Sequence, residues 1–238
     1  MRQKRAIQMV RKALAGVVPY RSVRQDLRLA ESALSSAVRG LCAEWSAGRK
    51  GPRPGRNLKL NIGCGNLVLD GWSNLDAFPV AGALYLNAIN GLPFPDGSAI
   101  HIHCEHFLEH LDYDDAEAFL AECFRVLQPK GSLRIIVPDA GKYIAAYCRD
   151  ETSFFEQLRY LGNARNPLET KIHVVNQMFR MGGEHKFAWD FETLRHSSLK
   201  AGFHSISASS RGDVPPEFAI DGADDWRQLE SLYANICK

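Results

Sequence analysis

Short apolar runs recur along the middle of the chain and predict β-strands. Five such runs cover residues 58–62, 72–76, 83–87, 99–104 and 132–137. Between the last two, apolar residues recur every three or four positions, which predicts an amphipathic helix. Its buried face would carry Ala116, Phe119, Leu120, Cys123, Val126 and Leu127. Strands that alternate with helices indicate a parallel sheet in a doubly wound α/β domain.

Polar and turn-forming residues mark where these elements begin and end. Asp112, Asp114 and Asp115 crowd the first turn of the predicted helix, where the helix dipole favours negative charge, and Pro129-Lys130-Gly131 ends it. A second helix is predicted over residues 191–202, with Asp190 as its N-cap. Residues 203–209 and 230–237 predict a closing antiparallel pair of strands. Residues 163–189 look irregular, and a loop of that length is a candidate for function.

The first part of the chain has a different pattern and a different charge. Apolar residues recur at helical spacing up to residue 48, and the sequence GRKGPRP over residues 48–54 indicates a linker. Residues 1–56 hold 13 Lys or Arg and three acidic residues, a net charge of +10, whereas the whole chain carries +2, which leaves −8 for the remainder. We predict a basic helical N-terminal extension over residues 1–56 and one domain over residues 57–238.

The basic extension suggests what kind of partner it meets. A charge of this sign suits an anionic partner or an anionic membrane surface, and a solvated arm or an oligomer contact is the alternative. Nucleic acid is not expected as a partner, because the extension offers few aromatic residues beyond Tyr20 and Trp45 for stacking on bases.

Composition limits the class of protein. A chain of 238 residues that is 45% hydrophobic can bury a full core. No apolar run reaches the ~18 residues of a membrane span, and Arg11 and Lys12 interrupt the only apolar stretch that resembles a signal peptide. The 6 cysteines include no C-x-x-C pair, which suits reduced thiols. We therefore expect a cytoplasmic protein.

The run LKLNIGCG over residues 58–65 is the strongest indication of a ligand site. Glycines at 63 and 65 allow positive φ and let a nucleotide-like group approach the backbone. A strand followed by two closely spaced glycines occurs in the sites of several nucleotide cofactors and also in ordinary tight turns. The dinucleotide-binding fingerprint requires a third glycine at the position where this chain has Val68. The ribose-binding acidic residue of that fingerprint also lies further along the chain than Asp76 does. Asp76 can still accept hydrogen bonds from both hydroxyls of one ribose.

Several further motifs occur in a characteristic order. They are LNIGCG (60–65), GWSNLD (71–76), LPFPDGS (92–98), EHFLEHL (105–111), RVLQPKG (125–131) and VPD (137–139). This order resembles class I S-adenosylmethionine-dependent methyltransferases of the type 11 kind. The later motifs HKFAWDFETL (185–194), AGF (201–203) and ESLY (230–233) resemble a bacterial subgroup associated with glycan and cell-surface biosynthesis.

The resemblance covers residues 58–238 and implies a fold, a cofactor and a set of binding residues. The fold would be a Rossmann-like, doubly wound, mostly parallel seven-stranded sheet with a terminal antiparallel strand. The cofactor would be S-adenosylmethionine, its methionine part at the glycines, its ribose at Asp76 and its adenine facing Asn87, where the family usually has an aspartate. The implied cofactor-binding residues are Gly63, Cys64, Gly65, Asp76, Asn87, Ala88 and Glu105.

Histidines are the natural candidates for the chemistry. Transfer of a methyl group requires the acceptor atom to lie about 3 Å from the methyl carbon, and a hydroxyl acceptor must also lose a proton. His106 is the first candidate for the base, because it follows a central strand, and His185 is the second. His110 is more often structural at such a position. The predicted activity is methyl transfer to a hydroxyl or amine of a small-molecule or glycan-precursor acceptor.

Two other functions compete with this prediction. The sequence HIHCEH over residues 101–106 resembles the metal cluster of metallo-β-lactamase-type hydrolases, in which His101, His103 and His106 would hold zinc. That function would leave the glycine turn and Asp76 without a purpose. The other alternative is a non-catalytic protein that binds the donor as a scaffold. Asn87, where the family usually has an aspartate, would then indicate loss of activity.

Overall fold

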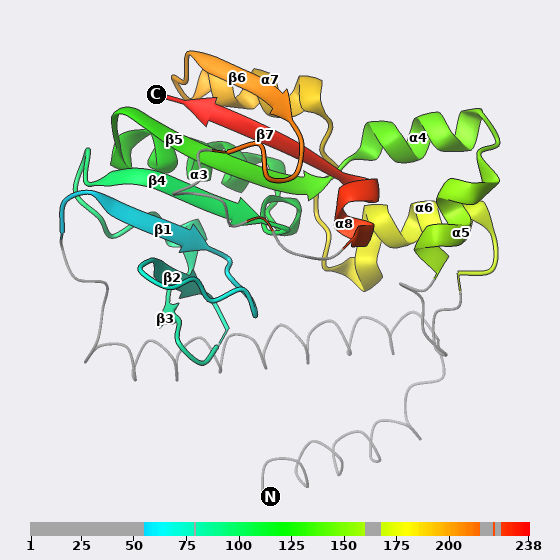
Figure 1. Cartoon of the computed structure of the whole chain (residues 1–238), viewed down its shortest axis with the longest axis horizontal. Helices are drawn as coiled ribbons and strands as arrows, with labels where there is room; N and C mark the ends of the chain where they lie inside the picture. Colours follow the sequence, from blue (N-terminus) through cyan, green and yellow to red (C-terminus); the bar gives the residue numbers. More distant parts are fainter. Residues whose placement is uncertain (1–54, 79, 160–167, 215–220, 222–224) are drawn as a thin grey trace, which may run out of the picture. The chain divides into compact units, whose positions relative to one another are not determined.

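The computed structural model describes residues 55–78, 80–159, 168–214, 221 and 225–238, which contain a sheet in the order β3-β2-β1-β4-β5-β7-β6 (Figure 1). The 7 strands are β1 (Leu58–Ile62), β2 (Ser73–Asp76), β3 (Leu84–Tyr85), β4 (Ala99–Glu105), β5 (Leu127–Pro138), β6 (Ser205–Ser209) and β7 (Ser231–Cys237). β7 runs antiparallel to both of its neighbours, and the other pairs are parallel. The predicted fold class is confirmed.

The helices follow the predicted boundaries over part of the chain. They are α3 (Tyr113–Val126), α4 (Ala140–Cys148), α5 (Thr152–Leu158), α6 (Lys171–Arg180), α7 (Phe191–Lys200) and α8 (Asp225–Glu230), with 3₁₀ turns η1 (Ala88–Asn90), η2 (Leu108–His110) and η4 (Met181–Gly183). Asp112 is the N-cap residue of α3. The Asp190 carboxylate accepts the Thr193 N–H at 2.8 Å and so caps α7 as predicted.

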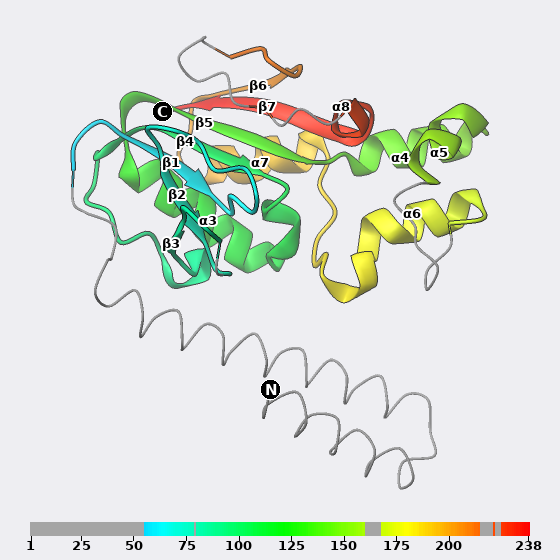
Figure 2. The ribbon, with the colours of Figure 1, turned by 60° about the horizontal axis from the view of Figure 1, so that its bottom comes forward.

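One face of the sheet is apolar and is covered by α3 and α7 (Figure 2). Its strand residues are fully buried, and the register aligns Leu60 with Ile102, Ile102 with Leu133, and Leu133 with Ile236. Burial of these aliphatic side chains supplies the main driving force for the fold. It also fixes which side chains point to the opposite face, because a strand alternates its side chains between the two faces.

The opposite face carries a row of polar side chains that crosses five adjacent strands. The row consists of Asn74, Asn61, His103, Arg134 and Asn235, which are neighbours in register. We call these residues the polar row. Its members bond along the row: Asn61 Nδ2 donates to Asn74 Oδ1 at 3.0 Å, and Arg134 Nη1 donates to Asn235 Oδ1 at 2.8 Å. Burial at this depth requires such pairing.

The polar row also holds two loops. Asn61 Nδ2 donates to the Leu67 carbonyl at 2.6 Å, and the Asn74 amide exchanges hydrogen bonds with the backbone of Leu69 at 2.9 Å. The segment that follows the glycine turn is therefore braced against the sheet. At the other end, the Arg134 guanidinium forms a bidentate pair with the Asp221 carboxylate, and both side chains are buried.

A helical excursion leaves the sheet after β5 and contains α4, α5 and α6. These helices lie together beyond the carboxyl ends of β4 and β5 (Figures 1 and 2). They share a separate apolar cluster that includes Tyr143, Phe155 and Val174. The two ends of the excursion meet, because Asp139 and Trp189 form an isolated parallel bridge and the Ala140 N–H donates to the Trp189 carbonyl at 2.8 Å.

Three expectations about the elements differ from the structure. The predicted strand over residues 83–87 contains only two strand residues, because Asn87 caps η1 instead. The segment 163–189 is not irregular throughout: residues 171–180 form α6, which begins with a capping box at Thr170 and buries Val174 and Met178. β5 starts directly after α3 at Leu127, before the predicted Pro-Lys-Gly stop.

The predicted extension over residues 1–56 lies outside the described residues except for its last two positions. The connections between β1, β2, β3 and β4 contain no α-helix among the residues that are described there. No helix within the described ranges has both the length and the apolar character needed to cross a membrane.

Candidate functional site

The glycine turn follows β1 and has the predicted backbone conformation. Gly63 and Gly65 have φ values of 66° and 49°, and the Cys64 N–H between them donates to the Leu75 carbonyl at 3.1 Å. A Cβ on Gly63 would lie 2.4 Å from the Phe107 ring, whereas one on Gly65 would meet nothing within 4 Å. Gly63 is therefore required for packing, and Gly65 is the position that opens onto free space.

The carboxylate of Asp76 joins the glycine turn to the next loop. It accepts the Gly65 N–H at Oδ2 (2.8 Å) and the Phe78 N–H at Oδ1 (2.7 Å). Each carboxylate oxygen has a second lone pair, so both can still accept a hydroxyl donor. The side chain is thus oriented by the backbone before any ligand arrives.

The residues after β3 provide the next part of this edge. Asn87 Oδ1 accepts the Ile89 N–H at 3.3 Å and so forms the N-cap of η1, which leaves its amide nitrogen as a donor. Ala88 is buried at 5% exposure and packs in the core. Cys64 is also buried, and desolvation, with the Asp76 charge as the next cause, raises the pKa of its thiol to about 11.

Three exposed apolar side chains on the segments that follow β1, β2 and β3 were missed by sequence reasoning. Val68, Phe78 and Ile89 are 43%, 55% and 52% exposed. Phe78 and Ile89 each lie two residues beyond a polar residue that ends or follows a strand, namely Asp76 and Asn87. That spacing is the pattern that would have found them. Apolar surface of this kind suits the flat face of a base.

Glu105 is the last residue of β4, and its buried carboxylate is paired with a cationic side chain. Its carboxylate pairs with the Arg227 guanidinium of α8, and its Oε2 lies 3.8 Å from His103 Nε2. The pair joins the last residue of a central strand to the helix that precedes β7. Glu105 is therefore engaged by protein groups on the side of the sheet where the polar row lies.

His106 follows Glu105 in a strained conformation. Its φ is 50°, its N–H donates to the Ile136 carbonyl at 2.8 Å, and its Nε2 lies 2.9 Å from Ser231 Oγ. Burial, with the Arg227 charge as the next cause, lowers the pKa of the imidazole to about 3. A non-glycine residue held at positive φ is costly, and such residues concentrate at functional sites.

Two buried carboxyl groups, Glu109 and Glu230, act on each other in this part of the structure. Glu109 Oε1 is 3.5 Å from His106 Nδ1, and neither Glu109 oxygen has a hydrogen-bond partner among the described residues. Burial raises the pKa of Glu109 to about 8. Glu230 accepts a hydrogen bond from the Tyr143 hydroxyl, and burial raises its pKa to about 7. This part of the edge therefore disfavours negative charge.

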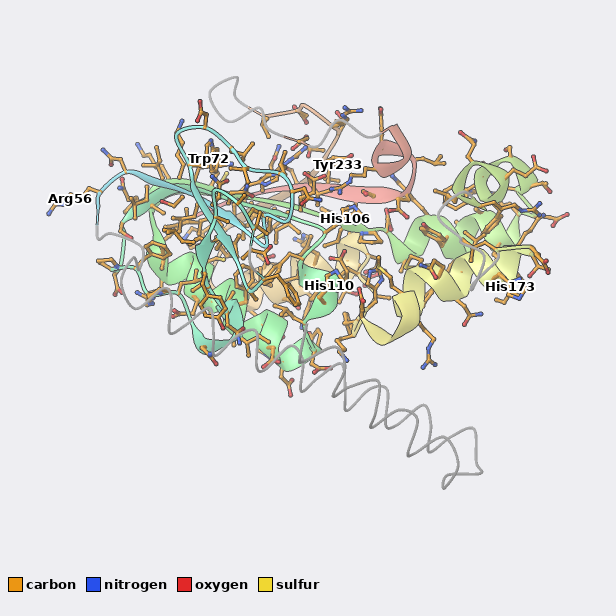
Figure 3. All side chains as sticks on the ribbon, turned by 90° about the horizontal axis from the view of Figure 1, so that it is seen from below. Arg56, Trp72, His106, His110, His173 and Tyr233 are labelled. Carbon is orange, nitrogen blue, oxygen red and sulfur yellow. The ribbon has the colours of Figure 1, made fainter. Side chains whose placement is uncertain are left out.

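His185 lies next to the same group of residues. Its ring makes an edge contact with the His110 ring, with centroids 5.0 Å apart, and its Nδ1 lies 2.5 Å from the Met178 carbonyl. Burial lowers its pKa. Figure 3 shows His106 and His110 near the carboxyl edge of the sheet and His173 far from them on α6. The two candidate bases, His106 and His185, thus share one region.

The histidines of the alternative hydrolase cluster do not converge in the structure. His101 and His103 lie on the polar face of β4, where they are buried rather than at a sheet edge. His101 Nδ1 bonds with Ser132 Oγ at 2.6 Å, and His103 Nδ1 lies 3.2 Å from Asn61 Oδ1. His106 bonds elsewhere, with Ser231. Within the described ranges, this trio does not form a group with metal-ligand spacing.

Comparison with known proteins gives one family match. Residues 76–135 match the model of a family described as methyltransferase domain. No curated protein sequence matches the chain. This match covers 60 of the 238 residues, from the end of β2 to the middle of β5.

Solved structures similar to this chain include three S-adenosylmethionine-dependent methyltransferases. The one from Thermotoga maritima has 17% identity and a TM-score of 0.46, over 89% of this chain and 96% of its own. The one from Archaeoglobus fulgidus has 15% identity and a TM-score of 0.45, over 84% and 94%. The one from Mesorhizobium loti has 14% identity and a TM-score of 0.43, over 82% and 98%.

The residues at the glycine turn fit the cofactor of a methyltransferase. The empty space beside Gly65 is where a Cβ would otherwise stand, so a ligand can reach the backbone there. Asp76 keeps two free acceptor sites for the two hydroxyls of a ribose. Ligands of open α/β sheets bind at the carboxyl ends of the strands, which is where both residues lie.

Proposed function

We propose that this protein transfers the methyl group of S-adenosylmethionine to a hydroxyl or amine of a small-molecule or glycan-precursor acceptor. The observation that carries the proposal is the open position beside Gly65, next to a carboxylate that the backbone has already oriented. The motifs over residues 185–194, 201–203 and 230–233, which resemble a glycan and cell-surface subgroup, support the acceptor class.

The donor would be held by the residues that the sequence singled out. Gly63, Cys64 and Gly65 form the turn at the methionine part, and Asp76 accepts the ribose hydroxyls. Asn87 offers its amide nitrogen near the adenine, with Ala88 behind it, and Glu105 borders the methyl side. Gly63 contributes through its packing on Phe107, because the Phe107 ring occupies the space where a Cβ would stand.

The chemistry asked of the protein is positioning and removal of one proton. When bound, the cofactor supplies an electrophilic methyl carbon on a sulfonium. His106 is the first candidate for the proton acceptor because it lies at the carboxyl end of central strand β4. Its placement carries this role, since a pKa lowered to about 3 makes the buried imidazole a weak base. Its ring is oriented by Ser231. His185 is the second candidate for the same role.

The test uses the full chain with isotopically labelled donor and a panel of sugar nucleotides, glycan precursors and small amines. Wild-type protein should bind S-adenosylmethionine in calorimetry and label at least one acceptor. His106→Ala should keep donor affinity within about threefold and lose about 10²- to 10⁴-fold in turnover, since that is the usual contribution of a general base.

The matched control is His196→Ala, because His196 is exposed on α7. It should behave like the wild type in both measurements. Absence of donor binding at millimolar concentration would overturn the proposal. Tight donor binding with no labelled product across the panel would instead favour the non-catalytic scaffold.

The remaining expectations concern the whole chain and stay predictions. They are the boundary at residue 56, the anionic partner or membrane surface for residues 1–56, and the cytoplasmic location. Release of the full chain from anionic vesicles by salt, compared with a chain that starts at residue 55, would test the second of these.

A further inference from the structure

Three side chains with metal-ligating atoms converge away from the glycine turn. They are Glu109 and His110 of η2 and His185, which follows η4. One ligand atom from each lies within 4.8 Å of the other two. We propose that Glu109, His110 and His185 bind one divalent transition-metal ion of the zinc type. Two imidazoles and a carboxylate are a common ligand set for Zn²⁺.

The hydrogen bonds of the two histidines leave the same ring nitrogen available on each. His110 Nδ1 lies 3.2 Å from the Glu184 carbonyl, and His185 Nδ1 lies 2.5 Å from the Met178 carbonyl. A carbonyl oxygen only accepts, so both Nδ1 atoms carry the proton. Both Nε2 atoms of the neutral rings then hold a free lone pair. Histidines that bind metals are usually oriented by such a bond from the other ring nitrogen.

The carboxylate of Glu109 is buried and accepts no hydrogen bond from the described residues, although His106 Nδ1 lies 3.5 Å from its Oε1. It is 2% exposed, and neither oxygen has a hydrogen-bond partner among the described residues. Arg227, whose charge acts on Glu109 through space, forms its ion pair with Glu105 instead. A buried carboxylate without compensation is costly. A dication at this position would supply the missing compensation.

The backbone holds the two ligand segments together although 74 residues separate His110 from Glu184. The Lys186 and Phe187 N–H groups both donate to the Glu109 carbonyl, at 2.8 and 3.3 Å. These bonds place residue 185 beside η2. The contact is therefore built by the fold and does not depend on the side chains alone.

The distances are close to those that an ion requires. His110 Nε2 and Glu109 Oε1 are 4.0 Å apart, and two ligands each about 2.1 Å from Zn²⁺ lie about 3.4 Å apart in a tetrahedral site. Since the three ligand atoms lie within 4.8 Å of one another, the widest pair must close by up to about 1.4 Å. Gly182 and Gly183, both at positive φ, precede His185 and give this segment the freedom to adjust.

Three protein ligands leave a fourth position of a tetrahedral ion for water or for an acceptor hydroxyl. His185 is then a ligand, and His106 remains as the candidate base. The proposal stands on these three residues and does not rest on methyl transfer, so its test uses the metal alone.

The experiment measures Zn²⁺ binding to the full chain after removal of metal with a chelator, by competition with a chromophoric chelator. Wild type should bind one equivalent tightly. His110→Ala, His185→Ala and Glu109→Gln should each weaken binding by at least about 100-fold, because each removes one of three ligands. His196→Ala is the matched control and should bind as the wild type does, because its histidine is exposed on α7.

Two further readouts separate a metal site from a structural cluster and from thiol binding. Co²⁺ should give the visible absorption of a nitrogen and oxygen site without thiolate charge transfer, although Cys148 and Cys237 are exposed. Glu109→Gln should unfold at the same or a higher temperature than metal-free wild type, because it removes an unpaired buried carboxyl, yet it should lose the upward shift that Zn²⁺ gives the wild type.

Two results would overturn the metal-site proposal. The proposal is overturned if wild type takes up no Zn²⁺ at micromolar concentration, or if the three ligand variants bind as tightly as His196→Ala. Calorimetry with S-adenosylmethionine on the same metal-free samples reports the donor site separately. Loss of Zn²⁺ binding can therefore be distinguished from loss of S-adenosylmethionine binding.

Discussion

The carboxyl edge of the sheet has two halves that treat their acidic residues in opposite ways. In the donor half, formed by the glycine turn and Asp76, both carboxylate oxygens accept backbone N–H groups. In the acid half, formed by Glu105, Glu109 and Glu230, the Glu109 carboxylate accepts no bond from the described residues and Glu230 has a raised pKa.

The difference teaches what each half needs from a ligand. The donor half is organised before binding. A ligand there donates hydrogen bonds to the free lone pairs of the Asp76 carboxylate, which the backbone already orients. In the acid half Glu105 is paired with Arg227, but burial raises the pKa values of Glu109 and Glu230, so a proton or a cation stabilises those two groups. Binding in the first half adds contacts, whereas binding in the second relieves an existing cost.

The largest effect should come from removing the acceptor of the donor half. Asp76→Ala should weaken S-adenosylmethionine binding about 1,000-fold, or about 4 kcal/mol, because two hydrogen bonds to a charged group are lost. Asp70→Ala, an exposed acid in the adjoining loop, is the control and should leave the affinity unchanged. Calorimetry measures both. Equal affinities for the two variants would remove Asp76 from the donor site.

A second effect should separate the two glycines of the turn. Gly63→Ala should lower the free energy of unfolding by about 3 kcal/mol, from positive φ and from overlap with the Phe107 ring. Gly65→Ala and the control Gly97→Ala have positive φ and open space, so each should cost about 1 kcal/mol.

Urea unfolding gives these differences, and donor affinity separates the last two variants. Gly65→Ala should bind S-adenosylmethionine about tenfold more weakly, because its new Cβ enters the space left for the ligand. Gly97→Ala should bind normally. If Gly63→Ala were as stable as Gly97→Ala, the packing role assigned to Gly63 would be wrong.

The smallest effect should appear in the acid half as a dependence on pH. The folded-state pKa of Glu230, about 7, lies above its ordinary value of 4.5, so the folded state binds the proton more tightly. Its contribution to stability is present below pH 4.5 and is lost as the pH rises through 7. Glu230→Gln removes the charge and keeps an acceptor for the Tyr143 hydroxyl.

Glu230→Gln should therefore be more stable than wild type by about 1–2 kcal/mol near pH 8, and the two should be equal in stability near pH 4.5. Urea unfolding at both pH values measures this. Glu169→Gln, an exposed site, should show no such difference. A constant gap between Glu230→Gln and wild type at all pH values would contradict the raised pKa.

The donor half could be predicted from the sequence because its residues are close together in the chain. Only eleven residues separate Gly65 from Asp76, and alternating strands imply that both lie at one edge. The contact of Phe107 with Gly63 could not be predicted, because it depends on how the backbone turns after β4 at positive φ.

The acid half was harder to predict for a related reason. His185 reaches His110 only through α6 and the turn after it, and the sequence pattern did not indicate that helix. His106 and Glu105 could be placed at the end of β4, but their partners Ser231 and Arg227 come from the last part of the chain. Periodicity identifies elements, not such distant pairs.

The bridge between Asp139 and Trp189 has a consequence for how this protein can change over time. The segment between these two residues leaves and re-enters the sheet at one point, so it can be replaced without shifting the strands on either side, provided that its bonds to Glu109, Glu230 and Ser231 are kept. Such an insert can diverge or be exchanged as a cassette while the cofactor machinery is inherited intact. A chimera that carries another protein's segment between these two residues would test whether the glycine turn and Asp76 keep their affinity for the donor.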